Sequence, residues 1–545
     1  MNIRKLLYLA ALLVVQTGLA NNLSMDLPAI ASGPFQPDWD SLVNYEAPEW
    51  FRDAKFGIWA HWGPQCEAER GDWYGRHMYS QGHWQYDHHV KKYGHPTTHG
   101  FKDVIQAWKA ERFDPEKLVR FYKENGARYF MALANHHDNF DNFDSKYQPW
   151  NSVRVGPRKD LIGGWAKAAR NNGLRFAVSV HASHAWTWYE LAQGSDKDGP
   201  YAGVPYDGKL TQADGVGQWW DGLDPQALYE QDHLPSPGFE KPEALFNRWT
   251  WGNGASQPDA DYVLKFFKRT KQLWDDYAPD QIYFDDTVLP FHGITDEVGL
   301  KLAAHFYNSR LDDSGRTEAV MNGKLLNERQ RQAMVYDIER GKAFGILPEP
   351  WQTDTCIGSW HYDREIFREH RYKSAASVIR MLIDIVSKNG NLMLSVPLRS
   401  DGQLDEDEIR IVTQIGDWLK LNGEAIYGTR PWKVYGEGPS TETSEAGYFD
   451  GQADVSSTTF TARDIRFTQS KDGKTLFAIA LEIPVDGMVR IHSLAAGSEL
   501  WPGSIGSVGL VGAGELQFIR DEAGLRVLIP ANLDRHTALA LRIRS

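Results

Sequence analysis

The chain has 545 residues, 42% of them apolar and 24% charged, which is enough for a large core and two or more domains. Its formal net charge of -13 argues against nucleic acid or an anionic membrane as the main partner. The 21 Trp and 23 Tyr favour a carbohydrate ligand, because flat aromatic faces stack on sugar rings, although most of these residues are expected in the core.

The N-terminus has the pattern of a secretory signal. Arg4 and Lys5 precede an apolar run over residues 6–15, and Gly18-Leu19-Ala20 supplies the small residues of a cleavage site. The run is too short to span a bilayer well, and no cysteine follows Ala20 to carry a lipid. We therefore predict a signal peptide over residues 1–20, no membrane anchor, and a periplasmic or secreted location.

Cysteine and metal-binding motifs are sparse. Cys66 and Cys356 are too few for a disulfide scaffold, and the sequence leaves open whether they form one bridge or remain two thiols. The chain contains neither a CxxC nor an HExxH motif. We therefore predict no metal and no cofactor.

Strand-like and helical segments alternate from Trp50 to about residue 430. Apolar runs typical of buried strands cover residues 56–62, 129–134, 174–181, 281–285, 319–322 and 391–397. Helical patterns cover residues 115–125, 161–172, 377–388 and 405–421. This alternation predicts parallel strands, and the number of units suits a (β/α)8-like barrel. A doubly wound open sheet is the alternative, but no GxGxxG motif follows a strand.

Polar side chains gather where the predicted strands end. They are His61, His136, His137, His181 and Asp285. The carboxyl ends of barrel strands meet at the face where (β/α)8 enzymes carry their catalytic residues. The pair Asp285-Asp286 therefore places two carboxylates at a candidate active site, although one of them alternatively caps the next helix.

The sequence pattern changes after about residue 430. Short alternating runs over residues 459–467, 475–483, 488–493 and 525–529 are separated by turn residues, which predicts an antiparallel β-sandwich. We expect a catalytic domain over residues 21–434 and a supporting β-sandwich domain over residues 435–545. A segment rich in Gly, Asp and Pro interrupts the first domain at residues 190–258, and insertions of this length are usually functional or mobile.

Several independent motifs follow one another in a recognisable order. They are AKFGIWAHWG at residues 54–63, NHHD at 135–138, GPRKD at 156–160, VSKNGNLML at 386–394, and NGEAIYGTRPW at 422–432. Together they resemble the α-L-fucosidases, glycoside hydrolase family twenty-nine, over roughly residues 45–435. The resemblance implies a barrel enzyme that removes terminal α-L-fucosyl residues with retention of configuration. Its substrate would be a fucosylated oligosaccharide or polysaccharide.

The resemblance also implies the two catalytic carboxyl groups. A retaining glycosidase pairs a nucleophile with an acid/base about 5–5.5 Å away. The family's nucleophile lies in an aromatic-x-Asp motif at a strand end, which here corresponds to Asp285; Asp286 is the alternative, but neighbouring strand side chains face opposite ways. The acid/base follows a basic residue, here Lys324, in a T-x-E-like context. The acid/base lies a dozen or more positions after this basic residue, which corresponds here to Glu339, and Glu349 is the alternative.

Sugar-binding residues carry over from the same motifs. Those implied are the hydroxyl-binding histidines His61, His136 and His137, the Glu-Trp-Tyr-like pair Asp72 and Trp73, and the aromatic residues Trp59 and Trp360, which would pack against the C5 methyl of fucose. Paired histidines also suggest a metal. However, adjacent side chains on a strand diverge, and no third ligand is spaced for zinc.

The fourth-strand region departs most from the family. His181 and His184 stand where the family usually shows a Tyr-containing strand end and a Glu-Trp. Linkage preference, natural glycan and oligomeric state therefore stay open. Two rival functions remain: the same chemistry on a related sugar such as an α-L-galactoside, and a fucose-binding protein without turnover. Retention of both carboxyl groups argues against the second.

Overall fold

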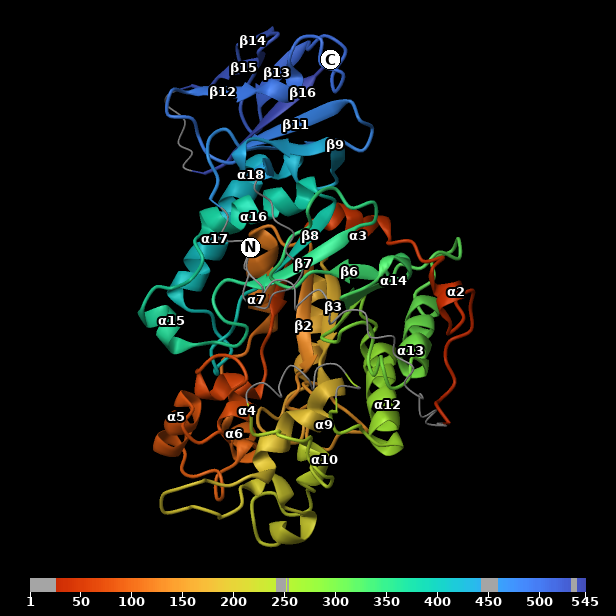
Figure 1. Ribbon diagram of the computed structural model, residues 1–545, viewed down its shortest axis with the longest axis vertical. Helices are drawn as coiled ribbons and strands as arrows, with labels where there is room; N and C mark the ends of the chain where they lie inside the picture. The colour runs from red at the N-terminus through yellow and green to blue at the C-terminus, as the bar shows by residue number, and fades with distance from the viewer. Residues whose placement is uncertain (1–25, 242–250, 252–253, 443–458, 531–536) are drawn as a thin grey trace, which may run out of the picture.

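Eight parallel strands form a closed barrel and follow one another around it in chain order (Figure 1). The computed structural model describes residues 26–241, 251, 254–442, 459–530 and 537–545. The barrel strands are β1 (Phe56–Ala60), β2 (Tyr129–Asn135), β3 (Arg175–Val180), β4 (Gln281–Phe284), β5 (Val320–Lys324), β6 (Val335–Asp337), β7 (Trp351–Cys356) and β8 (Gly390–Ser395). The predicted barrel is confirmed. The predicted signal peptide lies outside the described residues.

Two of the eight strands are not among those predicted. Strand β6 is three residues long, and β7 reads Trp-Gln-Thr-Asp-Thr-Cys, so neither presents an apolar run. Every residue of β7 is nevertheless buried. Its polar side chains face a polar barrel interior, where the Gln352 Oε1 accepts hydrogen bonds from Tyr129 (3.1 Å) and Gln281 (3.0 Å). A search of the sequence for apolar runs therefore does not find β7.

Helices surround the barrel and connect its strands. The longer ones are α7 (Pro115–Glu124), α8 (Leu161–Asn171), α12 (Ala260–Tyr277), α13 (Glu297–Asn308), α16 (Ala375–Ser387) and α17 (Glu406–Asn422). The shorter ones are α2 (Trp39–Leu42), α3 (Glu49–Ala54), α4 (Tyr74–His77), α5 (Trp84–Lys92), α6 (Phe101–Ala107), α9 (Ala185–Trp188), α10 (Gln226–Tyr229), α14 (Glu328–Ala333), α15 (Arg364–Arg368) and α18 (Pro439–Glu442). The N-cap side chain of Asp405 accepts from Glu408 N–H, so the capping box fixes where α17 begins.

The C-terminal strands form two antiparallel sheets, which confirms the predicted β-sandwich. One sheet has the order β13-β16-β11-β10-β9 and the other β12-β15-β14. Their bounds are β9 (Arg430–Glu437), β10 (Ile465–Gln469), β11 (Thr475–Ala480), β12 (Met488–Ile491), β13 (Ser507–Leu510), β14 (Phe518–Asp521), β15 (Gly524–Leu528) and β16 (Leu539–Arg544). The predicted domain boundary at residue 434 lies within β9 and stays a prediction.

The sandwich is fixed to the barrel through α16 and α17, which lie between the two in Figure 1. Nε of Arg466 in β10 donates to Asp384 of α16 at 2.6 Å, and both side chains are buried. The indole of Trp418 in α17 donates to the Ala538 carbonyl, also at 2.6 Å. A buried ion pair is tolerated only when its hydrogen-bond geometry is good. Displacing the sandwich would break the Arg466–Asp384 pair, so these contacts hold it in a defined position.

The 190–258 insertion packs against the long connection between β1 and β2. Its Asp207 accepts from the Tyr79 hydroxyl at 2.7 Å and lies 3.2 Å from Lys102 Nζ. Its Asp196 accepts from the Tyr86 hydroxyl at 2.8 Å. These buried contacts show that the described part of the insertion packs in a defined way against the β1–β2 connection.

The two cysteines are buried thiols rather than a disulfide. Burial raises the pKa of Cys66 to about 12, so its thiol stays protonated at neutral pH. Among the described residues, no helix is both long and apolar enough to cross a membrane.

Candidate active site

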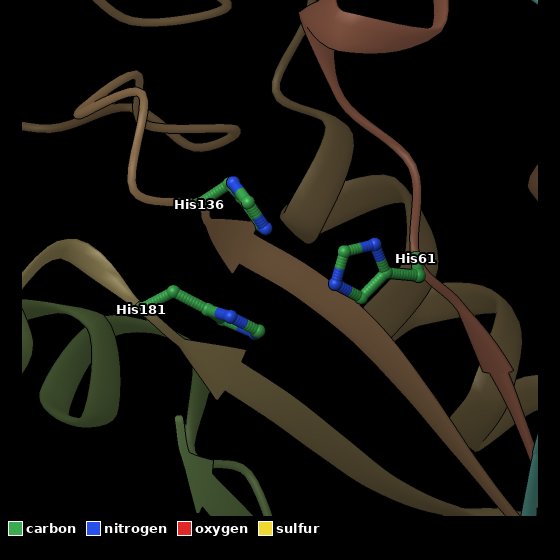
Figure 2. Close-up of side chains that lie close together, drawn as sticks. All are labelled: His61, His136 and His181. Carbon is green, nitrogen blue, oxygen red and sulfur yellow. The ribbon is translucent and has the colours of Figure 1, made fainter. Parts of the chain in front are cut away.

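Three histidines meet at the carboxyl ends of the first three barrel strands (Figure 2). His61 follows β1, His136 follows β2 and His181 follows β3, and all three are buried. One ring nitrogen from each lies within 4.8 Å of the other two. Nδ1 of His61 and Nε2 of His181 have no hydrogen-bond partner among the described residues. Because buried polar atoms are normally satisfied, these nitrogens mark a place for polar ligand atoms.

The hydrogen bonds of His136 favour a hydroxyl ligand over a metal in this triad. The Gln65 amide donates to Nδ1 of His136 at 2.7 Å and to Asp138 at 3.2 Å. The hydrogen of the neutral ring therefore sits on Nε2, which can donate to an oxygen but offers a metal no lone pair. Burial holds the pKa of His61 and His136 well below the ordinary value, so both rings are neutral. The sequence placed His181 at the same barrel face, but its spacing did not reveal that a third ring nitrogen comes this close to the other two.

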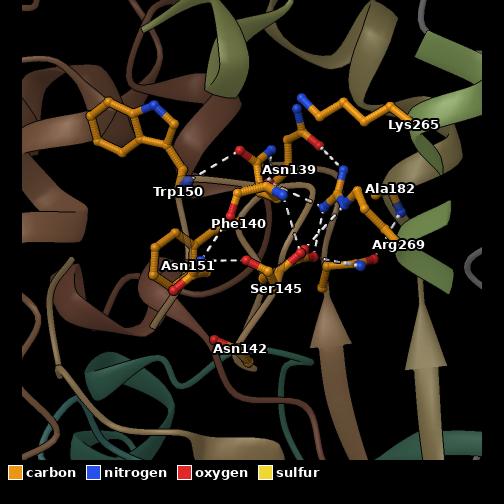
Figure 3. Close-up of polar contacts among 12 residues, drawn as sticks. Asn139, Phe140, Asn142, Ser145, Trp150, Asn151, Ala182, Lys265 and Arg269 are labelled. Atoms are coloured by element: carbon orange, nitrogen blue, oxygen red, sulfur yellow. Dashed lines mark hydrogen bonds and ion pairs between the residues drawn. The ribbon is translucent and has the colours of Figure 1, made fainter. Parts of the chain in front are cut away.

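A polar network fixes the loop that carries His136 and His137 (Figure 3). Arg269 of α12 donates from Nη1 to Asn139 Oδ1 at 2.5 Å and from Nη2 to Asp141 Oδ1 at 2.6 Å. Asn135, the last residue of β2, accepts at Oδ1 from the backbone N–H of His181 at 3.1 Å. The ends of β2 and β3 are thereby tied together, which fixes the relative positions of their histidines.

Asp285 and Glu339 approach a single ammonium group. Asp285 follows β4, Glu339 follows β6, and Lys324 ends β5 between them. Nζ of Lys324 contacts Oδ1 of Asp285 and Oε2 of Glu339. Since both oxygens are hydrogen-bonded to one nitrogen, they lie at most about 6 Å apart, twice the length of a hydrogen bond. Each carboxyl side chain keeps 17% of its surface exposed, so a ligand can reach both.

The two carboxyl groups differ sharply in acidity. Burial favours protonation of Asp285, but the Lys324 charge and the rings of His137 and His181 outweigh it and hold the Asp285 pKa well below its usual range. Nε2 of His137 lies 3.0 Å from Asp285 Oδ2, and Nδ1 of His181 lies 3.3 Å from it. Burial raises the pKa of Glu339 to about 7, against the opposing charge of Lys324. One group is thus an anion and the other an acid at weakly acidic pH.

The alternative carboxylates lie elsewhere. Asp286 faces away from Lys324, is buried, and accepts from Ser183 Oγ at 2.5 Å, with Nε2 of His184 at 3.1 Å. Glu349 is exposed on the surface. Neither has a contact with Lys324 among the described interactions.

Aromatic side chains form one wall of the site. The ring of Trp59 lies 5.5 Å from Trp360 and 4.8 Å from His61, measured between centroids. Trp59 is buried and Trp360 is partly exposed. Asp72 anchors the segment that carries Trp360, because it accepts from Ser359 Oγ at 3.0 Å and from His361 N–H at 2.7 Å.

Trp188 joins the site although the sequence did not single it out. Its ring lies 5.5 Å from His136, 5.0 Å from His137 and 5.3 Å from Trp73. It ends the short helix α9, which follows β3 after a 3-10 turn over Ala182–His184. The aromatic density of residues 186–189 is the one signal that marks this segment, and it does not distinguish a site residue from a core residue.

A barrel with two carboxyl groups, neutral imidazoles and an aromatic wall at its carboxyl-end face defines a glycoside hydrolase. The family model described as alpha-L-fucosidase matches residues 23–424, and the model described as alpha-L-fucosidase C-terminal domain matches residues 458–544. The chain belongs to the α-L-fucosidase family.

Known proteins support this placement. The chain is 24% identical to the human tissue alpha-L-fucosidase over 467 residues, covering 84% of this chain and 81% of that protein. It is 25% identical to the rat tissue alpha-L-fucosidase over 417 residues, covering 75% and 76%.

Two solved structures share the fold. A Thermotoga maritima alpha-L-fucosynthase bound to alpha-L-Fuc-(1-2)-beta-L-Fuc-N3 has a TM-score of 0.67 at 24% identity, covering 94% of this chain and all of that one. A trapped covalent intermediate of a Bacteroides thetaiotaomicron GH29 alpha-L-fucosidase has a TM-score of 0.58 at 16% identity, covering 96% and 100%.

Proposed function

We propose that the protein is a retaining, exo-acting α-L-fucosidase that releases terminal α-L-fucosyl residues from glycans through a covalent glycosyl-enzyme intermediate. The observation that carries the proposal is the placement of Asp285 and Glu339 around Lys324, with opposite protonation states. Family membership supports the sugar, and the trapped intermediate of the Bacteroides enzyme supports the covalent route. The predicted N-terminal signal supports a periplasmic or secreted location.

In the first chemical step Asp285 is the nucleophile. Its carboxylate attacks the anomeric carbon from the β face while Glu339 gives its proton to the departing glycosidic oxygen. Lys324 keeps the nucleophile ionised, because its ammonium pairs with the carboxylate in a largely buried setting.

In the second step Glu339 acts as the base. Having lost its proton, it takes one from a water molecule, which attacks the anomeric carbon from the α face and releases Asp285. Two inversions restore the starting configuration. A raised pKa serves both steps, since a group that titrates near neutrality can release and regain a proton.

Recognition of the sugar is assigned to the imidazoles and the aromatic wall. The unpartnered nitrogens of His61 and His181 offer hydrogen bonds to hydroxyl groups. Trp59 and Trp360 cover an apolar face where a C5 methyl would pack. A related L-sugar with a hydroxymethyl group at that position is expected to bind less well, by about 1–3 kcal/mol.

The direct test is hydrolysis of an aryl α-L-fucoside followed by proton NMR. Retention predicts that α-L-fucose appears first and mutarotates later. An aryl α-L-galactoside serves as the matched substrate, and we expect a lower kcat/KM on it. Initial release of β-L-fucose contradicts the retaining mechanism. Binding of the fucoside without turnover identifies a fucose-binding protein instead.

The pH profile is a second expected result. Because the Glu339 pKa is raised to about 7, its acid form is present below that pH and is lost above it, so kcat/KM should fall on the alkaline side. Because the Asp285 pKa is depressed, the nucleophile stays ionised throughout the weakly acidic range. A plateau from roughly pH 4 to 7 is expected, and an optimum well above pH 8 contradicts these assignments.

A further inference from the structure

Two further carboxyl groups lie beneath the catalytic pair, inside the barrel. Asp337 ends β6, and Asp354 lies in the middle of β7. Asp337 is in register with Gln352, which lies two residues before Asp354 and so faces the same side. Gln352 Nε2 donates to Asp337 Oδ2 at 2.7 Å, and the Tyr283 hydroxyl donates to Asp354 Oδ2 at 2.9 Å. Both aspartates are at most 2% exposed.

The remaining oxygen of each aspartate lacks a hydrogen-bond partner among the described residues. The two side chains are diagonal neighbours on the same side of β6 and β7, within reach of each other's charge. Two carboxylates in a buried site repel each other, and a single proton between them relieves the repulsion and satisfies both free oxygens. Burial and the neighbouring Asp354 charge raise the pKa of Asp337 well above the ordinary value, in keeping with a bound proton.

The charge balance of the interior requires such a proton. The ionisable groups around Lys324 are Asp285, Asp337, Glu339, Asp354 and the Tyr283 hydroxyl, and the Lys324 ammonium contacts both Asp285 and Glu339. Four buried carboxylates around one ammonium would leave three uncompensated negative charges, which is prohibitively costly in a low dielectric. One proton on Glu339 and one shared by Asp337 and Asp354 reduce this excess from three negative charges to one.

We propose that Asp354 is a positioning residue for the acid Glu339. Asp354 shares one proton with Asp337 and keeps a negative charge beside Lys324 and the Tyr283 hydroxyl. This charge keeps Glu339 protonated until the departing glycosidic oxygen takes the proton. The proposal rests on the assignment of Glu339 as the acid and concerns how that group is held ready. The β6–β7 pairing continues past Asp337, because Ile338 N–H donates to the Gln352 carbonyl at 2.9 Å and Arg340 N–H donates to the Asp354 carbonyl at 2.8 Å. Glu339 is therefore opposite Asp354, whose charge favours its protonated form, whereas Asp337 is opposite Gln352. The two aspartates therefore have different roles, although they share a proton.

The test is the pH dependence of kcat/KM on an aryl α-L-fucoside for Asp354→Asn and Asp337→Asn. In Asp354→Asn the negative charge that opposes ionisation of Glu339 is lost, so the alkaline limb of the kcat/KM profile should shift to lower pH by about one unit. In Asp337→Asn the group that shares the proton is lost and Asp354 is fully charged, so the alkaline limb of the kcat/KM profile should stay at the same pH or shift to higher pH. An unmoved limb in Asp354→Asn, or the same downward shift in both variants, overturns the proposal.

Infrared difference spectroscopy gives a readout without catalysis. The wild-type protein at pH 9 should show the carbonyl stretch of a protonated carboxylic acid that is absent from Asp337→Asn, and this comparison holds even if Asp354→Asn fails to fold. No difference between the two spectra overturns the shared proton. If Glu339 is not the acid, Glu339→Ala keeps the alkaline limb of the kcat/KM profile while the infrared band is unaffected. Failure of the acid assignment is thereby distinguished from failure of the shared proton.

Discussion

Replacing Asp285 with glycine is expected to reduce kcat by about 10⁴-fold or more, as for other residues that act as covalent nucleophiles. The fold should survive, because the side chain lies at the end of β4 and keeps 17% exposure rather than filling the core. The measurement is the rate on an aryl α-L-fucoside, with circular dichroism to verify folding. Asp286→Asn is the matched control: that carboxyl group is adjacent in sequence but pairs with Ser183 and His184.

Azide distinguishes loss of the nucleophile from general damage. In Asp285→Gly the small anion can occupy the space left beside Lys324, where the ammonium attracts it. It should then attack the anomeric carbon from the β face in a single displacement and give β-L-fucosyl azide. Near-wild-type activity of Asp285→Gly, combined with inactivity of Asp286→Asn, would transfer the role of nucleophile to Asp286.

Most of the fold follows from the sequence because six of the eight barrel strands are apolar runs. Periodicity locates α7, α8 and α17 to within two residues, since each has a cap or a stop signal at its ends. Strands β6 and β7 lack such a signal. Their side chains, among them Asp337, Gln352 and Asp354, face a polar barrel interior that no local pattern reveals.

The sequence marks residues that the structure brings to one barrel face, but it does not reveal the contacts between them. Motifs mark His61, His136 and Asp285, because each directly follows an apolar strand. The position of Lys324 between two carboxyl groups depends on the closure of three neighbouring strands, β4, β5 and β6, which is a tertiary property. The contact of Trp188 with both His136 and His137 likewise depends on how α9 folds back over the barrel.

Replacing Glu339 with alanine should separate good from poor leaving groups. Departure of a sugar alkoxide needs a proton, whereas departure of a dinitrophenolate does not. We therefore expect kcat/KM on fucosylated oligosaccharides to fall by about 10²–10⁴-fold, with a much smaller loss on a dinitrophenyl fucoside. Glu349→Ala is the matched control, because Glu349 is exposed and has no contact with Lys324 among the described interactions.

The second half of the Glu339→Ala experiment tests the base. With the activated substrate, hydrolysis of the glycosyl-enzyme should become rate-limiting, since the attacking water has lost its base. Azide needs no deprotonation, so it should restore the rate. It meets an intermediate already inverted by Asp285 and attacks from the opposite face, so the product should be α-L-fucosyl azide. The anomer thus reports which carboxyl group is missing: β from Asp285→Gly and α from Glu339→Ala. A β product from Glu339→Ala, or leaving-group dependence in Glu349→Ala instead, contradicts the assignment of Glu339.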